Sequence, residues 1–95
     1  MHTNHNWSYF DNLLVITEVY KNYRHKDYDL IIQNIANSIG TTTDSVFMKI
    51  SNMIYILSNG SYGHSNYSED SRLALFEFLD KNRNVSLNRL LMILK

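Results

Sequence analysis

The sequence predicts an all-α fold, a small bundle of about five helices whose first half resembles a helix-turn-helix. Apolar residues recur at helical spacing in successive segments, no segment alternates like a strand, and the chain contains no proline. Serine, threonine or aspartate precedes most of these segments, in the position of a helix N-cap. The 95 residues suffice for one core, so residues 1–95 are expected to form a single domain.

The first predicted helix covers about residues 9–22. Ser8 precedes it and Asp11 follows three positions later, which resembles a capping box. Trp7 is placed to act as a hydrophobic staple. The apolar stripe expected to face the core consists of Tyr9, Leu13, Ile16, Tyr20 and Tyr23.

A glycine and three threonines separate the second and third predicted helices. The second helix starts near Tyr28 and ends at Gly40, which can adopt the left-handed conformation that closes a helix. The third covers about residues 44–58, with Thr43 as its N-cap and Asp44 at the positive end of its dipole. The apolar face of the second helix consists of Ile31, Ile32, Ile35, Ala36 and Ile39.

The third helix is predicted to have two different faces. The apolar stripe expected to face the core consists of Val46, Phe47, Ile50, Ile54 and Leu57. The opposite side carries Ser45, Met48, Lys49, Asn52 and Tyr55. Such a polar side can read a DNA groove or simply face water.

Residues 59–67 form the longest predicted loop, with two glycines and no aliphatic side chain, so they are either a flexible connection or a functional surface. Ser68 should cap a fourth helix that reaches about Lys81, and Ser86 should cap a fifth. Apolar bulk in the fourth helix comes from Leu73, Leu75, Phe76, Phe78 and Leu79. The apolar face of the fifth consists of Leu87, Leu90, Leu91 and Leu94.

Composition limits the function. Nine Lys and Arg balance nine Asp and Glu, so DNA binding requires clustered charge, such as Lys21, Arg24, His25 and Lys26. The chain has no cysteine, no signal peptide and no apolar run long enough for a membrane span, so we expect a cytoplasmic protein without membrane contact. No nucleophile has a neighbouring base and no metal ligands converge, so we expect no catalytic residue, metal or cofactor.

Several segments together look like one known family. They are Trp7-Ser8 at a helix start, Ile-Ala-Asn-Ser-Ile-Gly at residues 35–40, Ser-Val-Phe-Met-Lys-Ile-Ser-Asn at 45–52, and Gly-His-Ser-Asn-Tyr-Ser at 63–68. The pattern, which spans residues 7–80, resembles the N-terminal helical bundle (NHB) domain of McrA-type modification-dependent restriction endonucleases. In that family the domain precedes a catalytic HNH domain.

The resemblance implies a non-catalytic domain that recognises 5-methylcytosine or a related modified cytosine in double-stranded DNA. It also implies that this domain directs a C-terminal HNH nuclease domain of the same protein to that DNA. The residues it implies are Ser45, Met48, Lys49 and Asn52 on the third helix and Gly63, His64, Ser65, Asn66 and Tyr67 in the loop. We add the turn residues Thr42 and Thr43, and Tyr62 as a contact for the cytosine methyl group. Family members often carry an arginine in this turn, where the chain has Thr41 and Thr42, so the arginine contact to phosphate or guanine is not expected there.

Some alternatives stay open from the sequence. Asn52 can contact DNA or tie the loop to the third helix. The loop can form a wall of the DNA site beside the amino-terminal end of that helix, or be a mobile connector. The rival function is a helical protein-protein interaction or dimerisation module, such as a homodimer, without DNA binding. Neutral charge favours it, as do Met92 and Ile93, which are expected to point away from the core and suggest that the chain continues into a longer protein.

Overall fold

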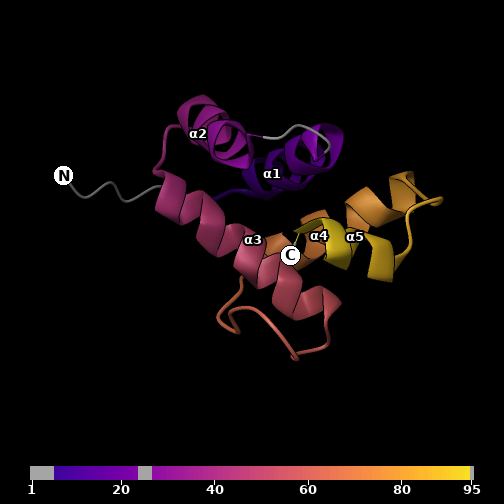
Figure 1. Cartoon of the computed structure of the whole chain (residues 1–95). Helices are drawn as coiled ribbons and strands as arrows, with labels where there is room; N and C mark the ends of the chain where they lie inside the picture. Colours follow the sequence, from indigo (N-terminus) through magenta and orange to yellow (C-terminus); the bar gives the residue numbers. More distant parts are fainter. Residues whose placement is uncertain (1–5, 24–26, 95) are drawn as a thin grey trace.

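Five α-helices connected by short turns and one long loop surround the apolar core (Figure 1). The computed structural model describes residues 6–23 and 27–94. No strand occurs among these residues, which confirms the predicted all-α bundle. The helices are α1 (Tyr9–Asn22), α2 (Tyr28–Ile39), α3 (Thr43–Leu57), α4 (Glu69–Lys81) and α5 (Leu87–Leu94).

Most helix ends lie where local capping chemistry predicts them. The Asp11 N–H donates to Ser8 Oγ at 3.1 Å and the Ser8 N–H to Asp11 Oδ2 at 3.3 Å, so the capping box before α1 is confirmed. Gly40 closes α2 with a φ of 88°. The N-cap of α3 is Thr42, not Thr43 as predicted, because Thr42 Oγ1 accepts the Ser45 N–H at 3.2 Å.

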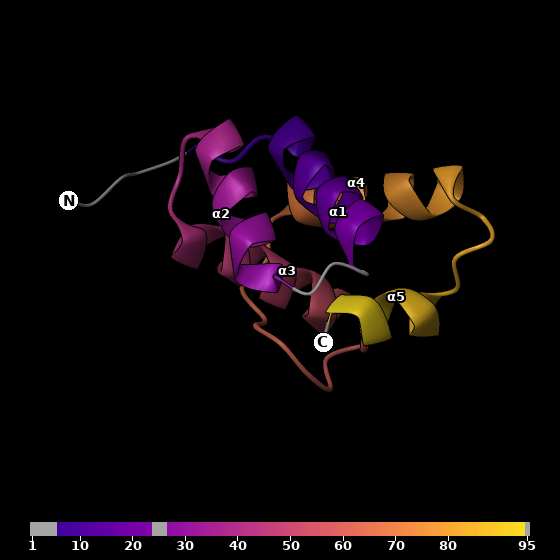
Figure 2. The same cartoon turned by 45° about the horizontal axis from the view of Figure 1, so that its top comes forward.

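The first and third helices each contact all the other helices. In addition, α1 packs along α4, and α2 covers another side of α1 (Figure 2). The inner side of α3 therefore contributes to the core along its whole length. The buried apolar residues of the core come from all five helices and from Val85, in the turn before α5.

The predicted orientation of α3 is wrong by part of a turn. Val46 and Ile50 are buried as expected, but Met53 takes the third core position and is fully buried. Phe47, predicted to be in the core, is 39% exposed and lies beside the Tyr28 ring, with the centroids 6.2 Å apart. Leu57 and Ile54 are only partly buried.

The prediction for α1 was also displaced toward one side. Its fully buried residues are Asn12, Val15, Ile16 and Val19, whereas most of the predicted stripe is only partly buried. The predicted stripe included three tyrosines as core residues, but these large side chains lie at the edges of the packed face. In α2 the predicted face is correct, with Ile32, Ile35 and Ala36 buried.

Three serines and an asparagine form a hydrogen-bonded chain between the start of α1 and the start of α4. The buried Asn12 side chain donates to Ser8 O at 2.7 Å and accepts from Ser71 Oγ at 2.7 Å. The Ser71 hydroxyl also meets Ser68 Oγ at 3.1 Å, and Ser68 Oγ accepts the Ser71 N–H. Each buried polar group in this chain thus has a partner, as burial requires.

The second half of the bundle leaves several large apolar side chains exposed. In α4, Leu75 and Phe78 are buried, but Leu73 and Phe76 face outward. In α5, Met92 is 77% exposed, as expected, whereas Ile93 is partly buried. Within the described part of the chain, no helix is both long enough and apolar enough to cross a membrane.

Candidate nucleic-acid interface

Trp7 ties the segment before α1 to the amino-terminal half of α3. Its indole N–H donates to Ser45 Oγ at 2.8 Å, and Lys49 Nζ lies 5.3 Å from the centroid of its ring. The predicted staple requires an apolar residue at the fourth position of α1, but that position is Asn12. Trp7 therefore stabilises a contact between helices rather than the local start of α1.

Lys49 lies at the edge of the packed side of α3, half-buried against Trp7. Burial lowers the pKa of its ammonium, and the nearby carboxylate of Asp70 partly offsets this by raising it. The ring face also attracts the cation. The Lys49 side chain therefore packs over the Trp7 ring and remains partly exposed to solvent.

The loop of residues 59–67 is attached to α3 by its backbone. The His64 N–H donates to Ser51 O at 3.1 Å, and the Asn52 side chain donates to His64 O at 2.9 Å. Gly63 has a φ of 86°, and a Cβ at this position would lie 2.3 Å from Ser51 O and 2.6 Å from the Tyr55 N. Only glycine allows so close an approach.

Asn52 is a residue that positions the loop. It is 1% exposed, and its amide group is directed to the loop carbonyl rather than to the surface. This agrees with the structural alternative left open by the sequence. A direct base contact by Asn52 would require the loop to leave α3.

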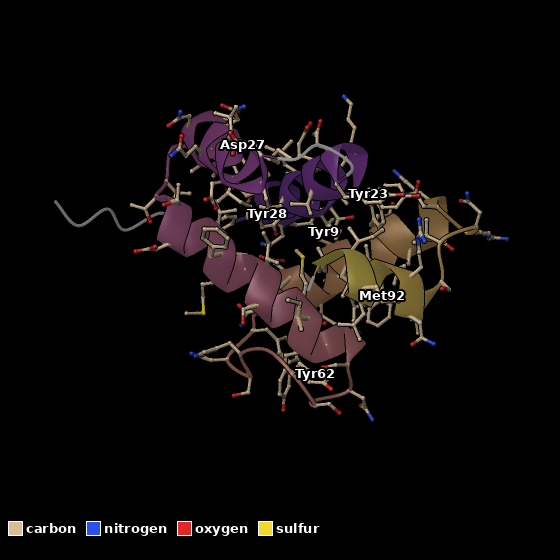
Figure 3. All side chains as sticks on the ribbon, viewed as in Figure 1. Tyr9, Tyr23, Asp27, Tyr28, Tyr62 and Met92 are labelled. Atoms are coloured by element: carbon tan, nitrogen blue, oxygen red, sulfur yellow. The ribbon has the colours of Figure 1, made fainter. Side chains whose placement is uncertain are left out.

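The loop does not lie beside the amino-terminal end of α3, as the sequence had suggested. It returns along the middle and the carboxyl-terminal half of that helix, where the Ser58 hydroxyl accepts the Tyr62 N–H at 3.0 Å (Figure 1). Tyr62 projects from the loop and is 54% exposed (Figure 3). The tip of the loop reaches Ser51, one helical turn beyond Met48 on α3.

The exposed surface of the loop is polar and aromatic. His64, Ser65 and Asn66 are exposed, and Tyr67 is 38% exposed. Nδ1 of His64 accepts the Asn66 N–H at 3.2 Å, so in the neutral ring the proton is on Nε2. The loop thus presents an imidazole donor and an amide next to an aromatic ring.

A hollow of about 380 Å³ lies between this loop and α4. Its aromatic wall includes Tyr55 and Tyr67, whose ring centroids are 6.1 Å apart, and Phe76. Arg72 completes its rim and is paired with Glu69. Sequence reasoning did not include Tyr55, Arg72 and Phe76 in the site, although Tyr55 was assigned to the correct side of α3.

The predicted site residues fall into two groups along α3. Thr42, Thr43 and Ser45 lie at its amino-terminal end, with Trp7 and Lys49 beside them. Residues 62–67 lie against the second half, held by Asn52. Met48, which is 44% exposed, lies on the stretch of α3 between the two groups.

The charge of this surface is close to neutral. Asp44, Glu69 and Asp70 accompany Lys49 and Arg72 there. Of the predicted basic cluster, Lys21 is exposed on α1, whereas Arg24, His25 and Lys26 lie outside the described residues. No group of three or more potential metal ligands occurs among the residues that the structure describes.

Comparisons of the chain with models of protein families, with curated proteins and with solved structures found no match.

Proposed function

We propose that this domain binds double-stranded DNA and reads modified cytosine, 5-methylcytosine or a related base, and so directs a nuclease domain of the same protein to its target. The observation that carries the proposal is the surface built from α3 and the loop attached to it. Met48, His64, Asn66 and Tyr67 are all exposed on these two elements. The family resemblance of residues 45–52 and 63–68 supports the same conclusion.

This mixture of side chains suits the chemistry of the major groove. The C5 substituent of cytosine projects into that groove and is detected by an apolar contact, while hydrogen-bonding groups fix the register. Met48 and Tyr67 are suitable apolar contacts, and His64 and Asn66 carry donors and acceptors. The groove, about 12 Å wide, admits a helix such as α3.

The nearly neutral charge of this surface predicts weak electrostatic binding. Each phosphate contact contributes about −0.9 to the slope of log affinity against log salt. With Lys49 and Arg72 as the described cations near this surface, we expect a slope of about −1 to −2. Discrimination should therefore depend on base contacts more than on phosphate attraction.

The proposal predicts tighter binding to modified than to unmodified duplexes of the same sequence, by about 1–3 kcal/mol per recognised base pair. Fluorescence anisotropy with methylated and unmethylated CpG duplexes, over a series of salt concentrations, measures this directly. Replacing His64 and Tyr67 together by Ala should remove the preference and leave the salt-dependent part of the affinity. Equal affinity of the wild-type chain for both duplexes would disprove reading of this modification.

Lys49→Ala is expected to weaken binding equally for both duplexes and to make the salt slope shallower by about one unit. The reason is that Lys49 supplies charge and no base readout, because its ammonium is held over Trp7. Lys81→Ala is the matched control, since Lys81 lies on α4 in an ion pair with Glu77 and away from the loop. If both variants lose affinity equally, Lys49 has no special role.

Association with protein remains the second candidate. The exposed apolar side chains of α1, α4 and α5, above all Phe10 and Met92, favour it. The two functions are compatible, since these residues lie on other helices than α3.

A further inference from the structure

The outer side of α1 carries an exposed aromatic ring. Phe10 is 76% exposed although it is a large apolar residue in a regular helix. Leu14, Thr17 and Lys21 follow it at intervals of four, three and four residues, so the four side chains form one stripe along the helix. Thr17 and Lys21 are exposed as well, and Leu14 is partly buried.

A largely apolar groove of about 450 Å³ lies beside the carboxyl-terminal half of the same helix, between α1 and α4. Its floor includes the rings of Tyr20 and Phe78, which meet edge to face with their centroids 5.3 Å apart. Lys21 and Lys81 stand at its rim. The complete lining is Leu13, Thr17, Tyr20, Lys21, Phe78, Lys81 and Asn82.

We propose that two copies of this chain associate through α1 in an antiparallel pair, with Phe10 of each copy inserted in the groove of the other. A two-fold axis between Leu14 and Thr17 places Phe10 opposite Lys21 and Leu14 opposite Thr17. Phe10 lies before that axis along α1 and the groove lies after it. The same contact therefore forms twice, once in each direction. The interface is isologous and closes at two chains.

Charge selects the antiparallel arrangement. Asp11, next to Phe10, lies at the amino-terminal end of α1, and Lys21 lies at the other end. Antiparallel pairing brings each Asp11 near Lys21 of the other copy, whereas parallel pairing brings like charges together. Lys81, across the groove, is already paired with Glu77. A cation at the rim also suits an inserted aromatic ring.

Sedimentation velocity over a wide range of protein concentration tests the proposal. The wild-type chain should show a reversible monomer–dimer equilibrium, which is weak because a single helix pair forms the contact. Phe10→Asp should raise the dimer dissociation constant by at least about tenfold, since it places a carboxylate where the ring was buried. Its circular dichroism spectrum should be unchanged, because Phe10 contributes little to the fold of the monomer.

Met92→Asp is the matched control, since Met92 is as exposed as Phe10 but lies on α5. It should leave the dissociation constant unchanged. A wild-type chain that stays monomeric at every concentration would overturn the proposal, and so would a Phe10→Asp variant that dimerises normally or a Met92→Asp variant that does not dimerise.

The register is tested by cross-linking, because the chain has no native cysteine. Leu14→Cys chains treated with a short bismaleimide should cross-link to each other, because Leu14 lies next to the two-fold axis. Lys21→Cys chains should not, because the two Lys21 positions are then separated by about 16 Å along the helix. Efficient cross-linking of Lys21→Cys chains would indicate parallel pairing and contradict the antiparallel arrangement.

Discussion

Met53→Ala is expected to lower the free energy of unfolding by about 2–5 kcal/mol. Met53 is fully buried in the core, on the carboxyl-terminal half of α3, a helix that contacts each of the other four, so its truncation leaves a cavity in the core. The total stability of a domain of this kind is about 5–15 kcal/mol. The variant should therefore show a markedly lower midpoint of thermal and urea unfolding, measured by circular dichroism at 222 nm, the helical band.

Phe47→Ala is the control that tests the orientation of α3. Phe47 is 39% exposed and packs mainly beside Tyr28, so its loss should cost about 1 kcal/mol, although phenylalanine is the larger side chain. A greater loss of stability from Phe47→Ala than from Met53→Ala would show that α3 is turned as the apolar pattern first suggested.

Gly63→Ala is expected to release the loop from α3 and abolish the preference for modified DNA. The new Cβ would lie 2.3 Å from Ser51 O, a backbone atom that cannot move without distorting the helix. The positive φ adds strain of about 1–3 kcal/mol. Amide hydrogen exchange measures the release, because the His64 N–H, which donates to Ser51 O, should lose its protection.

Gly40→Ala separates the two effects at Gly63. Gly40 has a similar φ of 88°, but a Cβ there meets no atom within 4 Å. This variant should lose some stability from backbone strain alone while His64 stays protected and DNA discrimination persists. If Gly63→Ala behaves like Gly40→Ala in all three measurements, the close approach of the loop to α3 does not control its function.

The features that the sequence predicted correctly are those with local causes. Three serine side chains accept a backbone N–H from the residue three positions later, namely Ser8, Ser68 and Ser86. Gly40 ends α2 because it adopts a left-handed conformation and its N–H donates to Ala36 O. Such interactions depend on a few neighbouring residues. Most helix boundaries can therefore be predicted from the sequence without knowledge of the tertiary structure.

The errors concern side chains whose environment comes from distant segments. A count of apolar residues assigns Phe47 to the core, since nothing local indicates which flank of α3 the other helices cover. For Asn52 the sequence left two roles open, because only the loop that returns from residue 59 and covers it decides between them. Trp7 seemed a local staple because its partner Ser45 lies 38 residues away.

The hydrogen bond between Asn12 and Ser71 determines how α1 and α4 are aligned along their length. Aliphatic residues such as Val15, Val19 and Leu75 would pack almost as well after a slide of one helical turn, about 5.4 Å. That slide would separate Asn12 from Ser71 and leave the buried Asn12 Oδ1 atom without its donor, at a cost of about 1–3 kcal/mol. One alignment of the two helices is therefore selected, and it also sets where Trp7, immediately before α1, meets α3.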